Sequence, residues 1–354
     1  MKRHGHLWPR VISLDNLLAA AAAARRRKRA RPAVARFEFH LETELLKLQR
    51  ELVEQCYVPG PYREFRIFEP KERWISAAPY RDRVVHHALV RVLEPIFERI
   101  FISDSYACRP ERGTHRAIDR CQQFARRFRY VWKADIRQFF PSIDHQVLKA
   151  ELGRKLKDPQ VLWLIDRILD GSGGQKPDPV WFPGDHLLTP LERRCGLPLG
   201  NQTSQFFANV FLDGLDHFVK DQLGVAGYLR YVDDFALFAD DKTSLWNWRQ
   251  EVIAFLATLR LRVHPRKDAI FPVDEGIRFL GFRIFPDHRR LNKDNVWRFL
   301  RRLRGLQMQF QRGEVNLREV RQRIQSWIAH ASHADTWRLR RSIFAAIVFD
   351  KGGG

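Results

Sequence analysis

Cysteine is scarce in this chain of 354 residues, which contains only four. They stand far apart, at Cys56, Cys108, Cys121 and Cys195. No two of them form a C-x-x-C pair, so the spacing argues against both a zinc site and a disulfide framework. We therefore expect a protein of a reducing compartment, the cytoplasm.

The chain also lacks a long apolar run. The nearest approach is LLAAAAAARRRKRARPAVAR, residues 17–36, whose apolar part is too short to cross a membrane. Its basic part follows the apolar part, which is the reverse of the order in a secretory signal peptide. We expect no membrane partner, and we interpret residues 1–56 as an N-terminal basic helical region. The basic end of the helix in this region can lie along phosphates.

Acidic residues are in the minority. The 41 Asp and Glu face 62 Lys and Arg, which gives a net charge of +21. Such an excess indicates a polyanionic partner, and nucleic acid is the default. Ribosomal and nucleoid proteins share this charge but are usually smaller or less aromatic. The 10 Trp and 26 Phe indicate a globular interior, and the length allows one large domain or two to three modest ones.

Two of the acids stand side by side in RYVDDFALFADD, residues 230–241. Short apolar runs flank Asp233 and Asp234, which is typical of two strands joined by a tight turn. The pattern predicts a hairpin with Asp233-Asp234 as its two-residue connection, and an acidic turn without chemistry is one interpretation of it. Two adjacent carboxylates repel each other unless a cation or solvent screens them, which favours a metal site.

A third carboxylate, Asp135, ends the apolar segment 130–136 within KADIRQFFPSIDH. A strand-end Asp placed beside a hairpin-tip Asp can hold two divalent cations. Nucleotidyl transfer needs such a pair, with one ion to activate the attacking 3′-hydroxyl and one to screen the triphosphate. Mg²⁺ binds a few carboxylates and takes substrate phosphates as further ligands, so a sparse acidic site is expected.

The rest of the chain is expected to form helices and hairpins around these acids. We expect helices over 12–55, most of 84–127, 145–170 and 243–262, a basic hairpin over 63–83 turning at 69–72, a turn and long helix over 196–223, and a strand or hairpin over 277–285.

The tail 290–349 is expected to be helical and is strongly basic. Its apolar residues recur near 3.6-residue spacing: Val296, Leu300, Leu303, Leu306 and Phe310, then Leu317, Val320, Ile324, Trp327 and Ile328. The arginines between them predict a surface that tracks phosphates, with a solvated surface as the alternative.

The segment Tyr231-Val232-Asp233-Asp234 resembles the Tyr-x-Asp-Asp signature of reverse transcriptases. Further blocks resemble that family in the same order, from roughly residue 57 to 345. They are Asp135 followed by Phe140, the block GLPLGNQTSQ (196–205), Lys267, and the primer-grip-like FLGF (279–282).

The resemblance implies an RNA-directed DNA polymerase with an α+β right-hand fold, in which helices flank an antiparallel palm sheet. It implies fingers over 57–128, a palm over 129–285 with insertions over 145–200, and a helical thumb over 286–350. The implied partners are template RNA, primer, cDNA and dNTPs.

The resemblance also implies roles for individual residues. Asp135, Asp233 and Asp234 would be catalytic and would bind two Mg²⁺ ions, or Mn²⁺ as a substitute, with Asp234 more supportive than direct. The implied nucleotide-binding residues are Lys71, Arg73, Phe140, Leu199, Gly200, Gln205 and Lys267. The implied template- and primer-binding residues are Arg109, Arg112, Tyr231, Leu280 and Gly281. Phe140 would exclude a ribose 2′-hydroxyl, and Gly200 would let the backbone approach the base pair.

One block departs from the common Gln-Gly-x-x-x-Ser-Pro pattern, since it reads Leu199-Gly200-Asn201-Gln202-Thr203-Ser204-Gln205. An aliphatic residue in place of Gln is similar to the reverse transcriptases of diversity-generating retroelements. That resemblance implies a bacterial or phage-encoded enzyme that misincorporates opposite adenine and works with a small basic accessory protein. Leu199 cannot donate hydrogen bonds to the nascent pair as Gln can, which loosens discrimination between bases.

Two alternatives stay open. One is another bacterial reverse transcriptase, of the antiphage-defence or retron type, and the other is an RNA-binding, maturase-like protein that has lost synthesis. After the expected thumb comes only FDKGGG, so we expect neither an RNase H domain nor an endonuclease domain.

Overall fold

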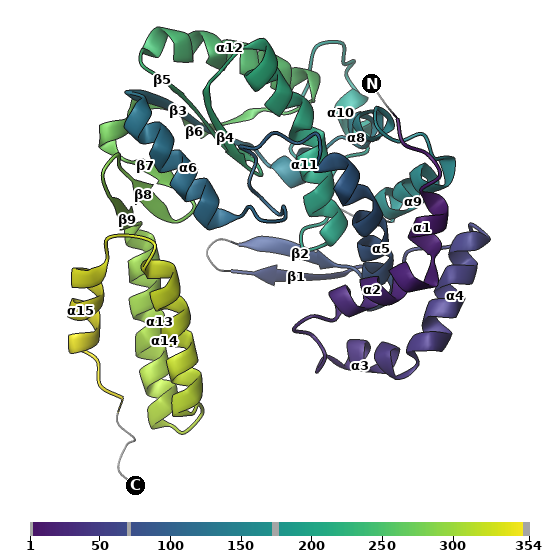
Figure 1. Ribbon diagram of the computed structural model, residues 1–354, viewed down its shortest axis with the longest axis horizontal. Helices are drawn as coiled ribbons and strands as arrows, with labels where there is room; N and C mark the ends of the chain where they lie inside the picture. Colours follow the sequence, from purple (N-terminus) through teal and green to yellow (C-terminus); the bar gives the residue numbers. More distant parts are fainter. Residues whose placement is uncertain (1–2, 69–71, 172–176, 350–354) are drawn as a thin grey trace.

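The computed structural model describes residues 3–68, 72–171 and 177–349, and it places a four-stranded sheet at the centre of an α+β fold (Figure 1). The strand order is β4-β5-β3-β6, and every neighbouring pair is antiparallel. The strands are β3 (Tyr130–Ile136), β4 (Gly227–Tyr231), β5 (Asp234–Ala239) and β6 (Val263–Pro272). The expected α+β class with an antiparallel sheet flanked by helices is confirmed.

Alternate residues of the strands enter two different cores, one on each face of the sheet. Trp132 and Phe235 pack into the core that contains α5 (Tyr80–Phe97), α8 (His145–Gly153), α9 (Pro159–Asp170), α11 (Gln202–His217) and α12 (Lys242–Thr258). Val131 and Phe238 pack into the other core, together with α6 (Thr114–Arg127). This two-residue alternation follows from strand geometry and fixes which residues share a face.

The N-terminal region is helical, as expected over 12–55, and it forms four helices. They are α1 (Trp8–Ile12), α2 (Leu14–Ala24), α3 (Pro32–Phe39) and α4 (Leu41–Val53). The arginine-rich stretch 25–31 is therefore a turn, which corrects the expectation that it ends a helix. Pro32 begins α3 and keeps Arg31 extended, because a residue before proline is disfavoured in the helical region.

The expected basic hairpin is present as β1 (Arg63–Ile67) and β2 (Arg73–Ala77), paired in antiparallel register with Arg63 opposite Ala77. Lys71, expected at its tip, lies outside the described residues. Two short helices, α7 (Phe139–Ser142) and α10 (Thr189–Glu192), lie in the loops after β3 and before α11. A π-helical turn, η1 (Phe218–Gln222), extends α11.

The C-terminal part begins with a small sheet of β7 (Ile277–Phe279), β8 (Phe282–Ile284) and β9 (Arg289–Leu291), after the short helix η2 (Val273–Glu275). The helices α13 (Lys293–Gln311), α14 (Leu317–Ala331) and α15 (Trp337–Ala345) follow. Leu303, Leu306 and Phe310 are buried as the spacing predicts, and so is Phe299, which the predicted row omits. Leu317, the first residue of α14, is 64% exposed, although the predicted row includes it.

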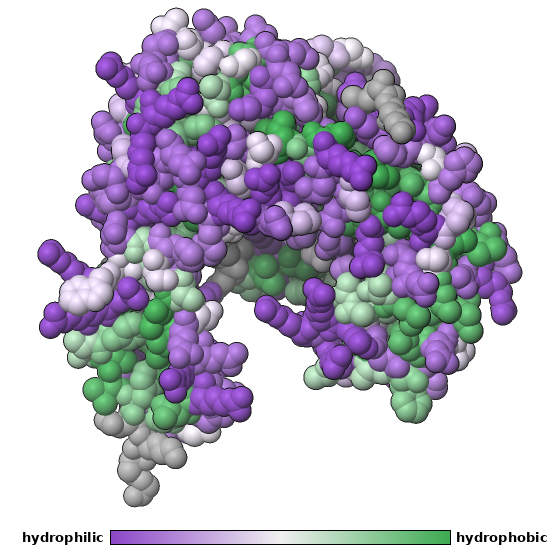
Figure 2. All heavy atoms as spheres, in the orientation of Figure 1, coloured by the Kyte–Doolittle hydropathy of each residue, from purple (hydrophilic) through white to green (hydrophobic). Residues whose placement is uncertain are grey.

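Figure 2 shows a hollow between the α13–α14 pair and the main body. Hydrophilic residues lie along much of its rim on this face, and hydrophobic residues are visible inside it. Within the described ranges, no helix is long and apolar enough to cross a membrane.

Candidate active site

The turn between β4 and β5 consists of Val232 and Asp233, not of the two aspartates. Tyr231 pairs with Asp234, which makes Asp234 the first residue of β5. Val232 has a φ of 58°, the left-handed conformation that tight hairpin turns require. The expected hairpin is present, but its connection lies one residue earlier than predicted. Asp233 is therefore the acid of the turn, and Asp234 is an acid of the sheet.

The sheet register brings Asp135 to this turn. Asp135 lies directly opposite Asp234 in the β3–β5 pair, so the two side chains project from the same face. The next residue, Ile136, donates its backbone N–H to the carbonyl oxygen of Asp233 at 3.0 Å. The three acids thus meet at one end of the central sheet, although nearly a hundred positions separate Asp135 from the other two in the sequence.

Asp233 carries an energetically costly charge. Burial and then the negative charge of Asp135 raise the pKa of the Asp233 carboxyl from 3.8 to about 6. Both effects disfavour the ionised form, so a cation placed between Asp135 and Asp233 would stabilise it.

Two lysines each pair with one of the other two acids and offset its negative charge. Lys267 donates from its Nζ to Oδ2 of Asp135 at 2.6 Å, and Lys133 forms an ion pair with Asp234. Burial lowers the pKa of Lys133 from 10.5 to about 8. Lys267, expected to bind nucleotide, therefore contacts a candidate metal ligand. Lys133 is absent from the expected site, although its position two residues before Asp135 on β3 places it on the same face.

The described residues contain no group of three or more His, Cys, Asp or Glu side chains arranged to hold a metal ion. Asp234 is paired with Lys133 and Asp135 with Lys267, and the charge of Asp135 acts on the buried carboxyl of Asp233. The donor set is made of carboxylate oxygens, which suits Mg²⁺, and Mg²⁺ commonly takes only one or two protein carboxylates beside substrate phosphates. The carboxylates at this end of the sheet therefore fit a divalent cation by their donor chemistry.

The block at 196–205 is attached to the basic hairpin. Ser76 of β2 donates its backbone N–H to the carbonyl oxygen of Leu199 at 3.3 Å, and Asn201 donates from its side-chain amide to the Ser76 carbonyl at 3.0 Å. Gly200 has a φ of 107°, and an added Cβ would meet Ile75 at 3.2 Å. Glycine is therefore required at this position by the backbone conformation alone. Gln205 is exposed on the first turn of α11.

Phe139 lies in the core, and Phe140 packs against the same core. Phe139 is buried, whereas Phe140 is half-buried, and their ring centroids lie 5.5 Å apart. The carbonyl oxygen of Phe140 accepts the N–H of Leu197 at 2.8 Å, which brings Phe140 to the same block as Leu199. Arg73 is exposed on β2.

Arg109 does not face solvent, which corrects its expected contact with template. Its side chain is 3% exposed. It donates to both carboxylate oxygens of Glu98 and to the carbonyls of Ile102 and Ser105, at 2.6 to 3.1 Å. All its donors are directed at the 98–105 segment, so Arg109 organises that loop. Arg112 is half-buried, with its guanidinium over the ring of Tyr106.

The remaining expected primer contacts lie at the junction with the C-terminal helices. The hydroxyls of Tyr231 and Thr114 are 3.2 Å apart, which connects the turn to the start of α6. Leu280 and Gly281 form the β7–β8 turn, both with positive φ. A Cβ on Gly281 would lie 3.8 Å from side-chain atoms of Asn295 and His330 on α13 and α14.

Comparison with known proteins assigns the family. Residues 69–284, more than half of the chain, match the family described as reverse transcriptase (RNA-dependent DNA polymerase). The chain belongs to the reverse transcriptase family. That membership places it among the RNA-directed DNA polymerases and, with the antiparallel sheet, assigns the α+β right-hand fold.

Several relatives share part of this chain. Protein YkfC of Escherichia coli K12 is 26% identical over 72% of this chain and 75% of its own length. The group II intron-encoded protein LtrA of Lactococcus lactis is 27% identical over 50% of this chain, which spans 28% of LtrA. An apo telomerase structure from Candida tropicalis has a TM-score of 0.49 and 14% identity, with 69% of this chain and 59% of the telomerase chain covered.

Proposed function

We propose that this protein copies an RNA template into cDNA by two-metal nucleotidyl transfer. The carrying observation is the end of the sheet, where Asp135 lies opposite Asp234 and the next residue, Ile136, binds the carbonyl oxygen of Asp233, so that the three acids meet. Burial and then the charge of Asp135 raise the pKa of Asp233 there. Divalent cations supply charge stabilisation for the attacking 3′-hydroxyl and the triphosphate. Asp135 and Asp233 hold the ions, while Asp234 keeps Lys133 in place through their ion pair.

We propose the same division of the chain that the sequence predicts: fingers over 57–128, palm over 129–285 and thumb over 286–350. The described parts of the β1–β2 hairpin carry Arg63, Arg66 and Arg73. A guanidinium such as that of Arg73 suits the triphosphate of an incoming dNTP. Phe140 and Gly200 act beside the same block, the first on the sugar and the second at the base pair.

Within the family, we propose the error-prone type that serves a diversity-generating retroelement, with a small basic accessory protein as partner. Support comes from Leu199, a half-buried apolar side chain at a position where the common family pattern has Gln. The second candidate is an intron-type or maturase-like RNA-binding role. It is favoured by the relatives, which include a group II intron-encoded protein and a nuclear intron maturase.

Primer extension on an RNA template, with Mg²⁺ and dNTPs, tests the catalytic proposal. We expect cDNA from the wild type and none from Asp135→Asn or Asp233→Asn, because each substitution removes a ligand charge. Asp274→Asn, which changes an exposed acid after β6, is the matched control and should retain activity. Full activity in both site variants would contradict the proposal. RNA binding without synthesis, even with accessory protein and cognate RNA present, would favour the maturase-like role.

Sequencing of that cDNA tests the subtype. We expect wild-type errors to concentrate opposite adenine and to fall about fivefold in Leu199→Gln, the equivalent of one hydrogen bond of about 1 kcal/mol. Leu187→Gln, which changes an exposed leucine in the preceding loop, is the control. An unchanged error spectrum in Leu199→Gln would remove the fidelity role from Leu199, and accurate wild-type synthesis would favour a defence or retron-type enzyme.

A further inference from the structure

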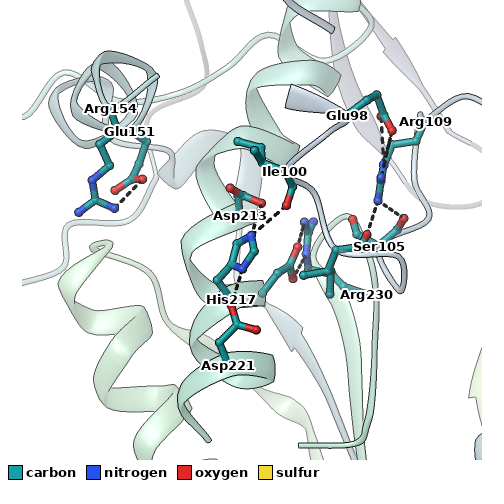
Figure 3. Close-up of polar contacts among 12 residues, drawn as sticks. Glu98, Ile100, Ser105, Arg109, Glu151, Arg154, Asp213, His217, Asp221 and Arg230 are labelled. Carbon is teal, nitrogen blue, oxygen red and sulfur yellow. Dashed lines mark hydrogen bonds and ion pairs between the residues drawn. The ribbon is translucent and has the colours of Figure 1, made fainter. Parts of the chain in front are cut away.

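A buried ion pair lies directly behind the turn that carries Asp233. Arg230 of β4 and Asp216 of α11 both have fully buried side chains. The guanidinium donates from Nε to Oδ1 of Asp216 at 2.7 Å and from Nη2 to Oδ2 at 2.5 Å, a two-pronged contact. Figure 3 labels Arg230 in this region of the fold. This geometry uses the planar fork of arginine, which lysine cannot reproduce.

The same guanidinium also holds the turn. Its Nη1 donates to the carbonyl oxygen of Val232 at 3.0 Å. Val232 is β-branched and adopts a left-handed φ of 58°, a conformation that such residues adopt only at an energetic cost. The hydrogen bond from Arg230 therefore acts on the residue of the turn that most needs an external restraint, immediately before Asp233.

Further hydrogen bonds hold Arg230 and Asp216 in place. The Tyr228 hydroxyl donates to Oδ1 of Asp216 at 2.7 Å. The backbone N–H and carbonyl of Arg230 are both hydrogen-bonded. The N–H donates to the Asp104 carbonyl at 2.9 Å, and the carbonyl accepts the Tyr106 N–H at 3.0 Å. The position of the guanidinium is thus set by α11, by β4 and by the 104–106 loop.

We propose that Arg230 is a positioning residue of the active site, which fixes the Val232 carbonyl and thereby sets the Asp233 carboxylate against Asp135. The inference rests on the proposed function of those two acids. A buried ion pair is weak evidence for stability, because desolvation offsets most of its attraction. The hydrogen bond from Arg230 to the strained turn instead gives this ion pair a role in the site.

The rival explanation is purely structural: the pair attaches α11 to the sheet and has no bearing on Asp233. The two explanations differ in the affinity of the site for a divalent cation. Residues that orient metal ligands without touching the metal typically contribute tenfold to a hundredfold to affinity. A merely structural pair would change thermal stability and leave that affinity unaltered.

The test is Arg230→Lys in the full chain, with Mn²⁺ binding followed by electron paramagnetic resonance and the melting temperature measured in parallel. We expect the Mn²⁺ affinity to fall at least about tenfold. In primer extension, we expect kcat to fall while KM for dNTP stays unchanged, since Arg230 does not touch the substrate side of the site.

Arg193→Lys is the matched control. The Arg193 side chain is 9% exposed. Its Nη2 donates to both carboxylate oxygens of Asp185 at 2.5 and 2.6 Å, and its Nη1 donates to the Val180 carbonyl at 3.2 Å. It holds a loop that is not part of the turn. We expect a comparable loss of melting temperature and an unchanged Mn²⁺ affinity.

Tyr228→Phe covers the case in which Arg230→Lys does not fold. It removes one donor from Asp216 without removing a charge, and we expect the Mn²⁺ affinity to fall about threefold. If Arg230→Lys behaves like Arg193→Lys, or if Tyr228→Phe leaves the affinity unchanged where the lysine variant is unfolded, the positioning role is overturned. If Asp135→Asn and Asp233→Asn leave Mn²⁺ binding intact, the proposed function fails instead.

Discussion

Asp233 occupies a position in which its own charge is costly. Its pKa is raised to about 6 in the fold from a reference value of 3.8. A group with a raised pKa contributes stability that is fully present below its unfolded pKa and is lost as the pH rises through the folded pKa. For Asp233 that window runs from about pH 4 to above pH 6. The metal-free protein is therefore less stable at pH 7.5 than its packing would allow.

We predict that Asp233→Asn stabilises the metal-free fold. At pH 7.5, in the presence of a chelator, the free energy of unfolding should rise by on the order of 3 kcal/mol, since each pKa unit corresponds to about 1.4 kcal/mol. At pH 4 the two proteins should be nearly equal. Urea unfolding at several pH values measures this, with Asp274→Asn as the control. Equal stability of the wild type and Asp233→Asn throughout would show that Asp135 and burial do not act on Asp233 as described.

Single residues differ in how far sequence alone could place them. Asp135 and Asp233 stand out because apolar strands isolate them. The contacts of Lys133 with Asp234 and of Lys267 with Asp135 depend on pairing between distant strands, which no local pattern specifies. Arg109 is a basic residue in a basic loop, which suggests a phosphate contact. In the fold, however, its guanidinium binds Glu98 and two backbone carbonyls. No local sequence pattern indicates these partners.

Among the elements, the turn 25–31 concentrates positive charge most strongly. It connects α2 to α3 on the side that faces α13 and α14 (Figure 1). Burial and the charges of Arg83 and Arg31 lower the pKa of Lys28, and burial together with Lys28 and neighbouring arginines lowers the pKa of His87 to about 4. Cations that depress each other's pKa values favour a polyanion nearby, such as template RNA.

We predict that Arg26→Gln, Lys28→Gln and Arg29→Gln together weaken RNA binding and its salt dependence. The slope of log affinity against log salt should become shallower by about 2, because about 0.7 counterions are released per neutralised phosphate of a single strand. Fluorescence anisotropy with a labelled RNA at several salt concentrations measures the slope.

The control is a triple substitution of equal charge, Arg154→Gln, Lys157→Gln and Arg167→Gln. These residues are exposed and lie on or near α8 and α9. This control variant should leave the slope of log affinity against log salt nearly unchanged. Equal slopes for both triple variants would make the turn a solvated surface with no particular contact to RNA.

Elements with a strong local pattern were predictable, and those without one were not. The alternating β1–β2 hairpin and the apolar spacing of α13 could be predicted from the chain. β6 could not, because it is an edge strand whose sequence, VHPRKDAIFP, contains two prolines and a run of three charged residues. The break between α2 and α3 was also missed, although Pro32 is the signal that could have shown it.

At the scale of the whole molecule, the turn that carries Asp233 is held by packing on both faces of one sheet. Trp132 and Phe235 tie β3 and β5 to the core with α5 and α11, and Val131 and Phe238 tie the same strands to the core with α6 and the C-terminal helices. The register between Asp135 and Asp234 is thus fixed by packing on two sides. Family and fold class followed from motif order, whereas the charge balance at the site required the register.

The most direct test of the account is Mn²⁺ binding at pH 7.5 by electron paramagnetic resonance, on the wild type, Asp135→Asn, Asp233→Asn and Asp274→Asn. The account predicts that both site substitutions weaken binding by at least about tenfold, while Asp274→Asn leaves it unchanged. Equal Mn²⁺ affinity in all four proteins would contradict the claim that Asp135 and Asp233 form a divalent-cation site.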